Sequence, residues 1–294
     1  MLELSNLNKV IYPDTGFTKA EVIDYYTRVA EVLLPRLTDR PLTRTRWPDG
    51  TGANQFFEKN APRGTPRWVR TVRLPAPDST RGTETVDYIV ADRTATIVWL
   101  ANLAALELHV PQWRLDTEGE PLGADLVVID LDPGAPATLV DCCRVAEWVR
   151  DRLAEDGLDS YPKTSGKKGM QLYVPIDETD EQHTTAYAKQ LATELSNQHP
   201  RQVTATMTKS QRPGKVFLDW SQNAGAKTTI APYSLRGLTR PTVSTPVTWD
   251  EVQTCTSPED LTFDPSAVLE RLERIGDLLR PLSDTRQRLP EVSH

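Results

Sequence analysis

The sequence predicts an α+β fold centred on a sheet with the element order β-α-β-β-α-β. Its first strand is the apolar run "DLVVIDL" at residues 125–131, and amphipathic helices are expected at about 136–156 and 181–198. Short β-rich runs lie between and after these helices. This is the split βαβ order of ferredoxin-like and RNA-recognition-like sheets, and it brings "VVIDLD" and "KVFLDW" (residues 215–220) into one sheet.

The first element along the chain is predicted to be one helix from about Thr18 to Leu37. Thr18 and Glu21 have the spacing of a capping box at its start. Apolar residues then recur with the helical period, at Val22, Tyr25, Tyr26, Val29, Val32 and Leu33.

Residues 41–113 combine strands with a helix. The runs "PLTRTRW" and "TVDYIVA" favour strands, whereas residues near 93–106 favour a helix. Residues 61–87 are rich in Pro, Arg, Thr and Ser, and we expect extended loops there.

The second half of the chain alternates more regularly. The helix at about 136–156 has an apolar face made of Leu139, Cys142, Val145, Val149 and Leu153. Strands are expected near "SYPKT", "MQLYVPI", "VTATM" and "KVFLDW". We expect residues 1–294 to form a single domain with an N-terminal α/β module (1–120), a catalytic sheet module (121–240) and a C-terminal helical segment (241–294).

Composition is that of a globular protein, with 38% hydrophobic and 26% charged residues in 294. The N-terminus has no signal pattern, and the longest apolar stretch is too short and mixed to span a bilayer. We therefore expect a cytoplasmic, nucleoid-associated protein without a membrane partner. Cys142, Cys143 and Cys255 form no CxxC pair and are expected to be reduced and buried.

The charge is distributed unevenly. The formal net charge is −7, yet residues 201–240 contain seven Lys or Arg and one acid, Asp219, which gives +6. The 54 residues that follow contain ten acids and five arginines, which gives −5. The basic stretch suits a polyanion, and a solvated basic face is the alternative.

Two aspartates, Asp130 and Asp132, end the apolar strand. Residues i and i+2 of a strand share a face, so both carboxylates project together. A hard divalent cation relieves the repulsion between them. Asp219 adds a third carboxylate, and the three can hold two Mg²⁺ or Mn²⁺ ions for phosphoryl transfer. Two solvated aspartates, or an ion pair of Asp219 with Lys215 or Lys227, explain the same residues.

The turn "KTSGKKG" at residues 163–169 has the composition of an anion site. Its glycines, Ser165 and lysines supply backbone N–H groups, a hydroxyl group and positive charge. It is not a Walker A loop, because the GxxxxGK spacing is absent and the segment joins two strands. Arg236 in "APYSLRG" and Lys227 in "NAGAKTT" offer further cations. A surface turn is the alternative explanation for the glycine turn and for each of these cations taken alone.

Basic and aromatic residues alternate in "RTRWPDG" and "NQFFEKN". Aromatic rings stack on unpaired bases while cations follow the nucleic-acid backbone, which makes Arg46, Phe56 and Phe57 candidates for DNA contact. A core aromatic beside one exposed by chance is the alternative. By the same standard, His109 in "LELHVPQW" is more simply a core histidine.

Taken together, these stretches closely resemble the polymerase domain of bacterial DNA ligase D and its stand-alone relatives, within the archaeo-eukaryotic primase superfamily. The resemblance runs in order from "NKVIYPDTGFTKAEVIDYY" through "QFFEK", "VVIDLDPG" and "TSGKKGMQLY" to "KVFLDWSQNAGAKTTIAPYSLRG". It implies a primase-type core with an RNA-recognition-like sheet. It also implies a polymerase that favours ribonucleotides and Mn²⁺, fills short gaps, extends ends and sometimes primes.

The resemblance also implies roles for single residues. Asp130, Asp132 and Asp219 resemble the metal-binding carboxylates. The candidates for contact with the incoming nucleotide are Ser165, Gly166, Lys168, Gln171, Lys227, Arg236 and His109. Lys9 and Lys19 match a pair that receives a 5′-phosphate at the far edge of a gap. The candidates for contact with the DNA template are Arg46, Phe56 and Phe57.

Two positions depart from the family pattern. Thr45 stands where relatives have a basic residue, which removes one template contact. Gln171 stands where the SGxxGxH motif ends in histidine, and a neutral carboxamide donates to phosphate with roughly half the strength of an imidazolium. We therefore expect a weaker hold on the triphosphate.

The sequence thus predicts a metal-dependent polymerase acting on gapped, overhanging or 5′-phosphorylated DNA with NTP or dNTP. The 294 residues leave no room for a ligase or nuclease domain, so we expect those activities from separate proteins or from a longer parent, with a DNA ligase and a Ku-type end-binding protein as the candidate partners. A gap- or break-end-binding module with weak or no catalysis is the alternative that Gln171 favours. A phosphatase built on the "DLD" motif is a third.

Overall fold

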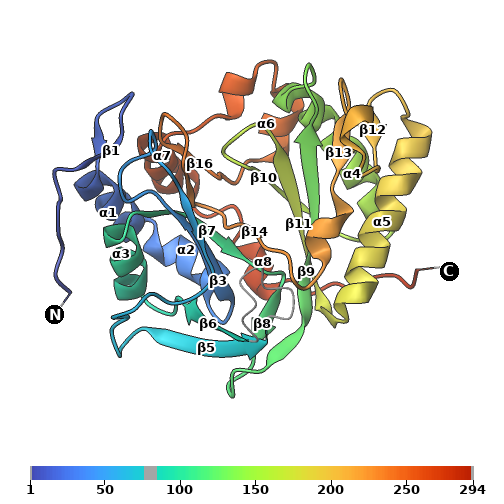
Figure 1. Cartoon of the computed structure of the whole chain (residues 1–294). Helices are drawn as coiled ribbons and strands as arrows, with labels where there is room; N and C mark the ends of the chain where they lie inside the picture. The colour runs from blue at the N-terminus through green and yellow to red at the C-terminus, as the bar shows by residue number, and fades with distance from the viewer. Residues whose placement is uncertain (1, 76–84, 293–294) are drawn as a thin grey trace.

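Two sheets form the framework of the chain in the computed structural model, which describes residues 2–75 and 85–292 (Figure 1). The N-terminal sheet has the strand order β14-β7-β3-β6-β5, with β4 paired to β3. Its strands are β3 (Pro41–Arg46), β4 (Phe56–Glu58), β5 (Arg70–Pro75), β6 (Thr85–Val90), β7 (Ala105–Val110) and β14 (Thr229–Ile230). The elements that share its core are α1 (Lys19–Arg28), α2 (Ala30–Leu37), α3 (Thr94–Asn102) and the hairpin of β1 (Val10–Tyr12) and β2 (Phe17–Thr18).

The second sheet has the order β10-β11-β9-β13-β12, with β8 paired to β9. Its strands are β8 (Trp113–Leu115), β9 (Pro121–Pro133), β10 (Tyr161–Thr164), β11 (Met170–Thr179), β12 (Val203–Thr204) and β13 (Val216–Leu218). Its helices are α4 (Leu139–Glu155), which follows β9, and α5 (Glu181–Gln198), which follows β11. The predicted β-α-β-β-α-β order is therefore confirmed. Because β9 pairs antiparallel with both β11 and β13, the prediction that "VVIDLD" and "KVFLDW" share a sheet is also confirmed.

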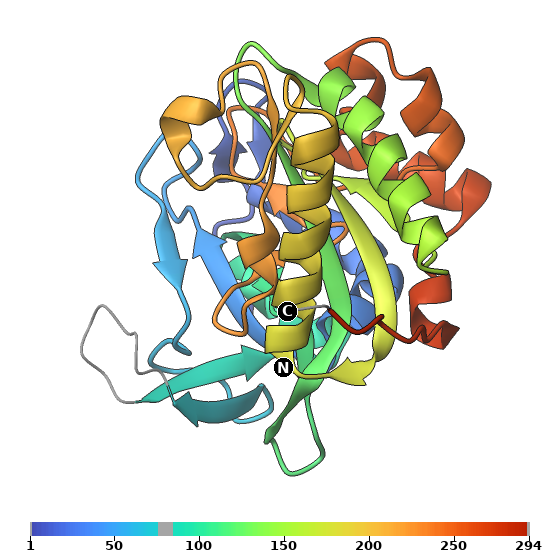
Figure 2. The ribbon, with the colours of Figure 1, turned by 90° about the vertical axis from the view of Figure 1, so that its right-hand side faces the viewer.

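Alternation along β9 decides what each face of the second sheet carries. Val127, Ile129 and Leu131 are at most 3% exposed and belong to the core that includes residues of α4 and α5. Figure 2 shows these two helices in front of the sheet. Asp130 and Asp132 alternate with the apolar residues, so they lie on the opposite face. The sequence pattern of this strand thus keeps both aspartates away from the helix-covered core.

The face that carries the aspartates is turned toward the N-terminal sheet and the C-terminal segment. Tyr173 on β11 donates its hydroxyl to the carbonyl oxygen of Ile230 on β14 (3.3 Å) and packs with Leu279 and Leu282. The chain after β14 contains β15 (Leu235–Arg236), β16 (Thr242–Val243), α6 (Trp249–Thr254), α7 (Pro265–Ile275) and α8 (Pro281–Asp284). A second layer therefore covers this face around Tyr173, whereas the Asp132 side chain remains 41% exposed.

The long N-terminal helix expected from the sequence is two helices. Its capping box is confirmed, because the Thr18 hydroxyl accepts from the Glu21 backbone while the Glu21 carboxylate accepts from the Thr18 N–H. Val29 then ends α1 and begins α2. Pro35 lies inside α2 and removes one of its backbone hydrogen bonds.

Two further expectations in this half were wrong in part. The helix expected at 93–106 ends at Asn102, because Ala104 adopts a positive φ of 56° that no helix continues, and β7 begins directly after it. Within the stretch 61–87, expected as extended loops, β5 forms a strand that pairs antiparallel with β6. Residues 76–84 of that stretch lie outside the described residues.

The cysteines agree with the sequence prediction. Cys142, Cys143 and Cys255 are buried free thiols. Within residues 2–75 and 85–292, no helix combines the length and the apolar character that crossing a bilayer requires.

Candidate active site

The three predicted carboxylates meet where β9 and β13 end. Asp130 and Asp132 lie on one face of β9, and Asp219 directly follows β13. The Asp219 N–H donates to the carbonyl oxygen of Asp130 (2.9 Å), which fixes the third aspartate beside the first. The pairing of Leu218 with Leu131 sets this register. The structure thus brings together all three aspartates that the sequence singled out.

Their proximity has an electrostatic cost at Asp130. Burial and then repulsion from Asp219 and Asp132 raise the pKa of Asp130 to about 7, although a hydrogen bond from Gln171 acts in the opposite direction. That bond runs from Gln171 Nε2 to Asp130 Oδ1 (2.8 Å). An ionised Asp130 is therefore costly in the protein alone, and a bound cation would relieve the cost.

The other two carboxylates are engaged by protein donors. Lys168 Nζ lies 3.1 Å from Asp132 Oδ1, and the Ser221 hydroxyl donates to Asp219 Oδ1 (2.6 Å). Across the described part of the chain, no group of three or more His, Cys, Asp or Glu side chains stands in a metal-ligand arrangement. Three carboxylates are nevertheless the oxygen donors that Mg²⁺ and Mn²⁺ prefer. The three carboxylates fit a divalent ion if the ion replaces the contacts of Asp132 with Lys168 and of Asp219 with Ser221.

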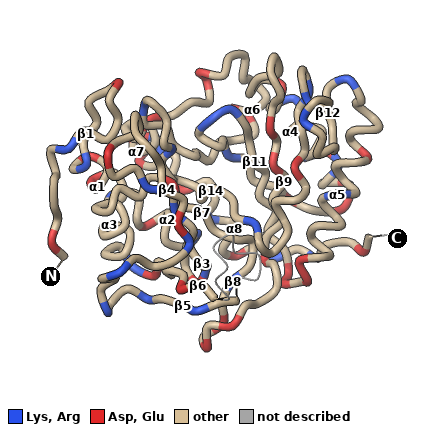
Figure 3. Tube along the Cα trace, viewed as in Figure 1, with Lys and Arg blue, Asp and Glu red and all other residues tan. Residues whose placement is uncertain are grey.

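A tight turn joins β10 to β11 beside these aspartates. The Ser165 hydroxyl accepts from the N–H groups of Lys167 (3.3 Å) and Gly169 (3.2 Å), so it closes the turn. Gly166 has a φ of 72°, and a Cβ there would lie 2.7 Å from the Arg236 side chain. Glycine is thus required both by the backbone conformation and by the close approach of β15. Figure 3 shows acidic and basic segments close to each other around the ends of β9 and β11.

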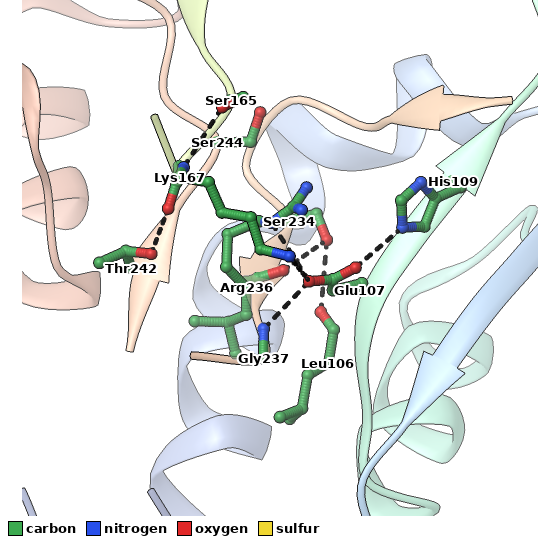
Figure 4. A network of polar contacts seen from close by, with 12 residues as sticks. Leu106, Glu107, His109, Ser165, Lys167, Ser234, Arg236, Gly237, Thr242 and Ser244 are labelled. Atoms are coloured by element: carbon green, nitrogen blue, oxygen red, sulfur yellow. Dashed lines mark hydrogen bonds and ion pairs between the residues drawn. The ribbon is translucent and has the colours of Figure 1, made fainter. Parts of the chain in front are cut away.

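A second polar group, the inter-sheet cluster, consists of Glu107, His109, Lys167 and Arg236 (Figure 4). One Glu107 oxygen lies 3.2 Å from Arg236 Nε and 4.0 Å from Lys167 Nζ. The other Glu107 oxygen lies within hydrogen-bond distance of His109 Nε2, at 3.1 Å. The N–H of Gly237 donates to Glu107 as well (3.1 Å). The cluster therefore places two predicted nucleotide contacts, His109 and Arg236, around one carboxylate.

The charge states of the inter-sheet cluster follow from these contacts. Burial would raise the pKa of Glu107, but hydrogen bonds from His109 and Gly237 and the charge of Arg236 hold this pKa at about 2. Burial lowers the pKa of His109, and Glu107 only partly offsets this. Glu107 is therefore ionised and His109 neutral at neutral pH, so the cluster's net positive charge comes from Arg236 and Lys167.

Sequence reasoning missed Glu107 and the buried Lys163. The alternation in "ALELHV" was the available signal for Glu107, since it places this residue and His109 on one face of a strand. Because residues near 93–106 were expected to form a helix, the start of this strand was not recognised. Lys163 is fully buried on β10, and its Nζ donates to the Ser244 hydroxyl (2.6 Å).

Lys227, predicted to bind the nucleotide, is exposed on the loop between β13 and β14. Its backbone N–H donates to the carbonyl oxygen of Ala224 (2.8 Å). The structure places the side chain in solvent rather than in the inter-sheet cluster.

Lys9 and Lys19 lie side by side at the start of α1. The Lys19 N–H donates to the Lys9 carbonyl oxygen (2.8 Å). Burial and then the charges of Lys9 and Arg46 lower the pKa of Lys19. Lys9 Nζ pairs with Asp49 (2.9 Å) and Lys19 Nζ donates to the Ser5 carbonyl (2.7 Å). The two predicted cations thus lie beside each other at a helix N-terminus, where Asp49 pairs with Lys9 and Lys19 is buried.

Phe56 and Phe57 are the aromatic residues that the structure exposes. They are 50% and 56% exposed on β4, which pairs with β3. Arg46, the third predicted template contact, instead donates to the Leu103 carbonyl (2.7 Å) and pairs with Glu58 (3.0 Å). The two rings are free to stack on bases, whereas the guanidinium is already engaged by the protein.

A family model described as "LigD, primase-polymerase domain" matches residues 18–279. The chain belongs to this family. The multifunctional non-homologous end joining protein LigD of Mycolicibacterium smegmatis is 46% identical over 284 residues, which are 96% of this chain and 36% of that protein. The bifunctional LigD protein of Bacillus subtilis is 34% identical over 94% of this chain and 43% of its own length.

The solved polymerase domain of Mycobacterium tuberculosis ligase D in complex with DNA matches with a TM-score of 0.91. It is 44% identical, and the match covers 97% of this chain and 99% of that one. The chain spans about a third to two fifths of the length of the curated LigD relatives. The resemblance to the LigD polymerase domain, and with it the primase-type α+β fold, is thereby confirmed.

Proposed function

We propose that this chain is a DNA-dependent nucleotidyltransferase that adds nucleotides, preferentially ribonucleotides, to a primer 3′-hydroxyl at gaps or broken ends. One observation carries the proposal: three carboxylates from neighbouring strands lie beside a lysine-bearing glycine turn, in a chain of the LigD primase-polymerase family. In-line phosphoryl transfer needs this combination of anionic ligands for metal and cationic groups for a polyphosphate.

Asp130, Asp132 and Asp219 would hold two Mn²⁺ or Mg²⁺ ions. When bound, such ions activate the attacking hydroxyl and stabilise the charge on the leaving pyrophosphate. The raised pKa of Asp130 supports this assignment, because the protein alone leaves its ionised form under-compensated. Lys168 would then leave Asp132 for the triphosphate, since a phosphate group offers it a stronger charge-assisted partner.

The turn at residues 165–169 and the inter-sheet cluster would hold the incoming nucleotide. Ser165 and Gly166 shape the turn, while Lys168 and Arg236 supply charge. His109, neutral and hydrogen-bonded to Glu107, would orient rather than neutralise the ligand. Lys227 would reach the nucleotide only by movement of its exposed side chain.

Lys9 and Lys19 would receive a 5′-phosphate at the far side of a gap. Two ammonium groups at the N-terminus of the ten-residue helix α1 favour a doubly charged anion. Phe56 and Phe57 would stack on template bases, as exposed aromatic rings do in single-strand-binding proteins. Arg46 would contribute to the same surface only after releasing Glu58.

We further propose that the enzyme acts at the nucleoid in the non-homologous end joining that its relatives' names state. DNA-ligase and Ku-type end-binding activities would be supplied by other proteins or by other parts of a longer protein. The relative solved with DNA supports a DNA substrate.

A second candidate is a gap- or end-binding module with little catalysis. The observation in its favour is that Asp132 and Arg236 are both neutralised internally, by Lys168 and Glu107. Both candidates predict binding to gapped DNA, and only the first predicts extension.

Primer extension by the native chain separates them, and Asp130→Ala tests the metal-dependent mechanism. We expect this substitution to abolish Mn²⁺-dependent primer extension while leaving the affinity for gapped DNA within about twofold of the native chain's. Asp151→Ala is the matched control, because Asp151 is 68% exposed on α4 and pairs only with its neighbour Arg150 among the described residues. Extension by Asp130→Ala at the native rate would refute the metal-dependent mechanism.

A further inference from the structure

Gln171 lies in the middle of a row of polar side chains that crosses the second sheet. It pairs in register with Lys163 on β10 and with Asp130 on β9. Asp219 continues the row beyond Asp130 through its backbone contact. Directly opposed residues on neighbouring strands project to the same face, so these four side chains are lateral neighbours.

The two polar atoms of the Gln171 carboxamide are in different situations. Nε2 donates to Asp130 Oδ1 at 2.8 Å. Oε1 is buried and, within the residues that the structure describes, has no hydrogen-bond partner. The whole residue is only 5% exposed. One N–H of its NH₂ group is thus committed to Asp130, and Oε1 is an acceptor.

This arrangement does not suit contact with a triphosphate. Phosphate oxygens accept hydrogen bonds, so the carbonyl oxygen cannot bind them, and the second N–H of the NH₂ group belongs to a residue that is only 5% exposed. Turning the carboxamide over would offer N–H₂ to the phosphate but would aim Oε1 at the Asp130 carboxylate, where two acceptors repel. The same flip would occur inside a buried site, where an unpaired polar group is costly.

The neighbours of Gln171 hold this orientation. Lys163 is fully buried, donates to the Ser244 hydroxyl at 2.6 Å and lies over the Tyr173 ring. It therefore closes the side of Gln171 that is opposite to Asp130. The flanking residues of β11, Met170 and Leu172, are fully buried in the core against α4 and α5 and anchor the strand.

We propose that Gln171 is a positioning residue that orients the Asp130 carboxylate for metal binding and does not contact the triphosphate. The proposal rests on the proposed function, because it assigns Asp130 to a metal. It replaces the expectation that this position binds phosphate more weakly than a histidine. Hydrogen-bond partners of metal ligands typically contribute 10- to 100-fold to metal affinity, so the effect of Gln171 is measurable without catalysis.

The test is a titration of the nucleotide-free protein with Mn²⁺, in which electron paramagnetic resonance measures the concentration of free Mn²⁺. Gln171→Leu keeps the volume and removes the donor, and we expect it to weaken Mn²⁺ binding 10- to 100-fold. At saturating Mn²⁺, its KM for NTP stays within about twofold of the native value. Gln171→His restores an N–H donor, and we expect it to recover Mn²⁺ affinity to within about threefold.

Gln112→Leu is the matched control. Gln112 is also buried (2% exposed) with an unpartnered Oε1 among the described residues, but its Nε2 donates to the Thr229 hydroxyl and not to a carboxylate. We expect this variant to bind Mn²⁺ as the native chain does. A fall common to both glutamine variants would indicate general loss of packing and overturn the proposal.

Two other results would also overturn it. Unchanged Mn²⁺ affinity with a raised KM for NTP would return Gln171 to the triphosphate, and no change in either quantity would leave it without a role in the site. If the native chain itself bound no Mn²⁺, the proposed metal site would fail, and the positioning role with it. That outcome is distinct, because it appears before any variant is compared.

Discussion

Replacing Asp130 by asparagine should make the metal-free protein more stable and the enzyme inactive. Burial and the neighbouring Asp219 and Asp132 raise the pKa of Asp130 from its ordinary 3.8 to about 7. Asparagine is nearly isosteric and uncharged, and its Oδ1 can still accept from Gln171. The substitution therefore removes the repulsion and keeps the hydrogen bond that the structure shows.

The sign and size follow from proton linkage. Between about pH 4 and pH 7 the folded chain keeps a proton on Asp130 that the unfolded chain has released, so stability falls as the pH rises through this window. Above pH 7 the loss is complete. A shift of about 3 pH units corresponds to at most about 4 kcal/mol at about 1.4 kcal/mol per unit, and relaxation of the site reduces this to about 2 kcal/mol.

Urea unfolding at pH 5 and pH 8 without divalent ions measures this difference. We expect Asp130→Asn to be about 2 kcal/mol more stable than the native chain at pH 8 and to lose much of that advantage at pH 5. Added Mn²⁺ should stabilise the native chain and have little effect on the variant. Asp151→Asn, at an exposed position on α4, should change nothing beyond about 0.5 kcal/mol.

A lower or equal stability of Asp130→Asn at pH 8 would refute this reasoning. It would show that burial and the two neighbouring carboxylates do not penalise an ionised Asp130 in the folded protein. The electrostatic support for a metal site would then be lost.

Two further predictions concern DNA. Replacing Lys9 and Lys19 together by Met should reduce the preference for a 5′-phosphorylated over an unphosphorylated gap by about 10- to 100-fold, because charge-assisted bonds to the phosphate are lost. Fluorescence-anisotropy titration measures this preference, and an unchanged value would contradict the phosphate site. Replacing Phe56 and Phe57 by Ala should weaken binding to gapped DNA by about 1–3 kcal/mol per lost stack. Because both rings are half exposed, the free energy of unfolding should stay within about 0.5 kcal/mol of the native value. Unimpaired binding would exclude stacking.

The sheet and its aspartates could be predicted because their signals are local. The apolar run "DLVVIDL" by itself predicts a strand, so Asp130 and Asp132 can be placed on one face without knowing which strands pair with it. The β-α-β-β-α-β order then placed Asp219 on a neighbouring strand. The resemblance to the LigD polymerase domain supplied the rest, since no spacing in the sequence marks Lys9 and Lys19 as a pair.

The internal partners could not be predicted, because they depend on contacts between distant segments. Glu107 and Arg236 form an ion pair only because the folded chain brings β7 next to β15, which is far away in the sequence. Lys168 reaches Asp132 because the turn packs closely on the end of β9, where a Cβ on Gly169 would overlap the Leu131 carbonyl. The break in the first helix at Val29 has no comparable local signal.

Primer extension by the native chain tests the central claim most directly. A labelled primer on gapped DNA with a 5′-phosphate is incubated with Mn²⁺ and either NTP or dNTP. We predict addition of nucleotides with both, and more with NTP, and no addition when the metal is chelated. Retained binding to the gapped DNA without extension by either nucleotide would contradict the account and leave a DNA-binding module in its place.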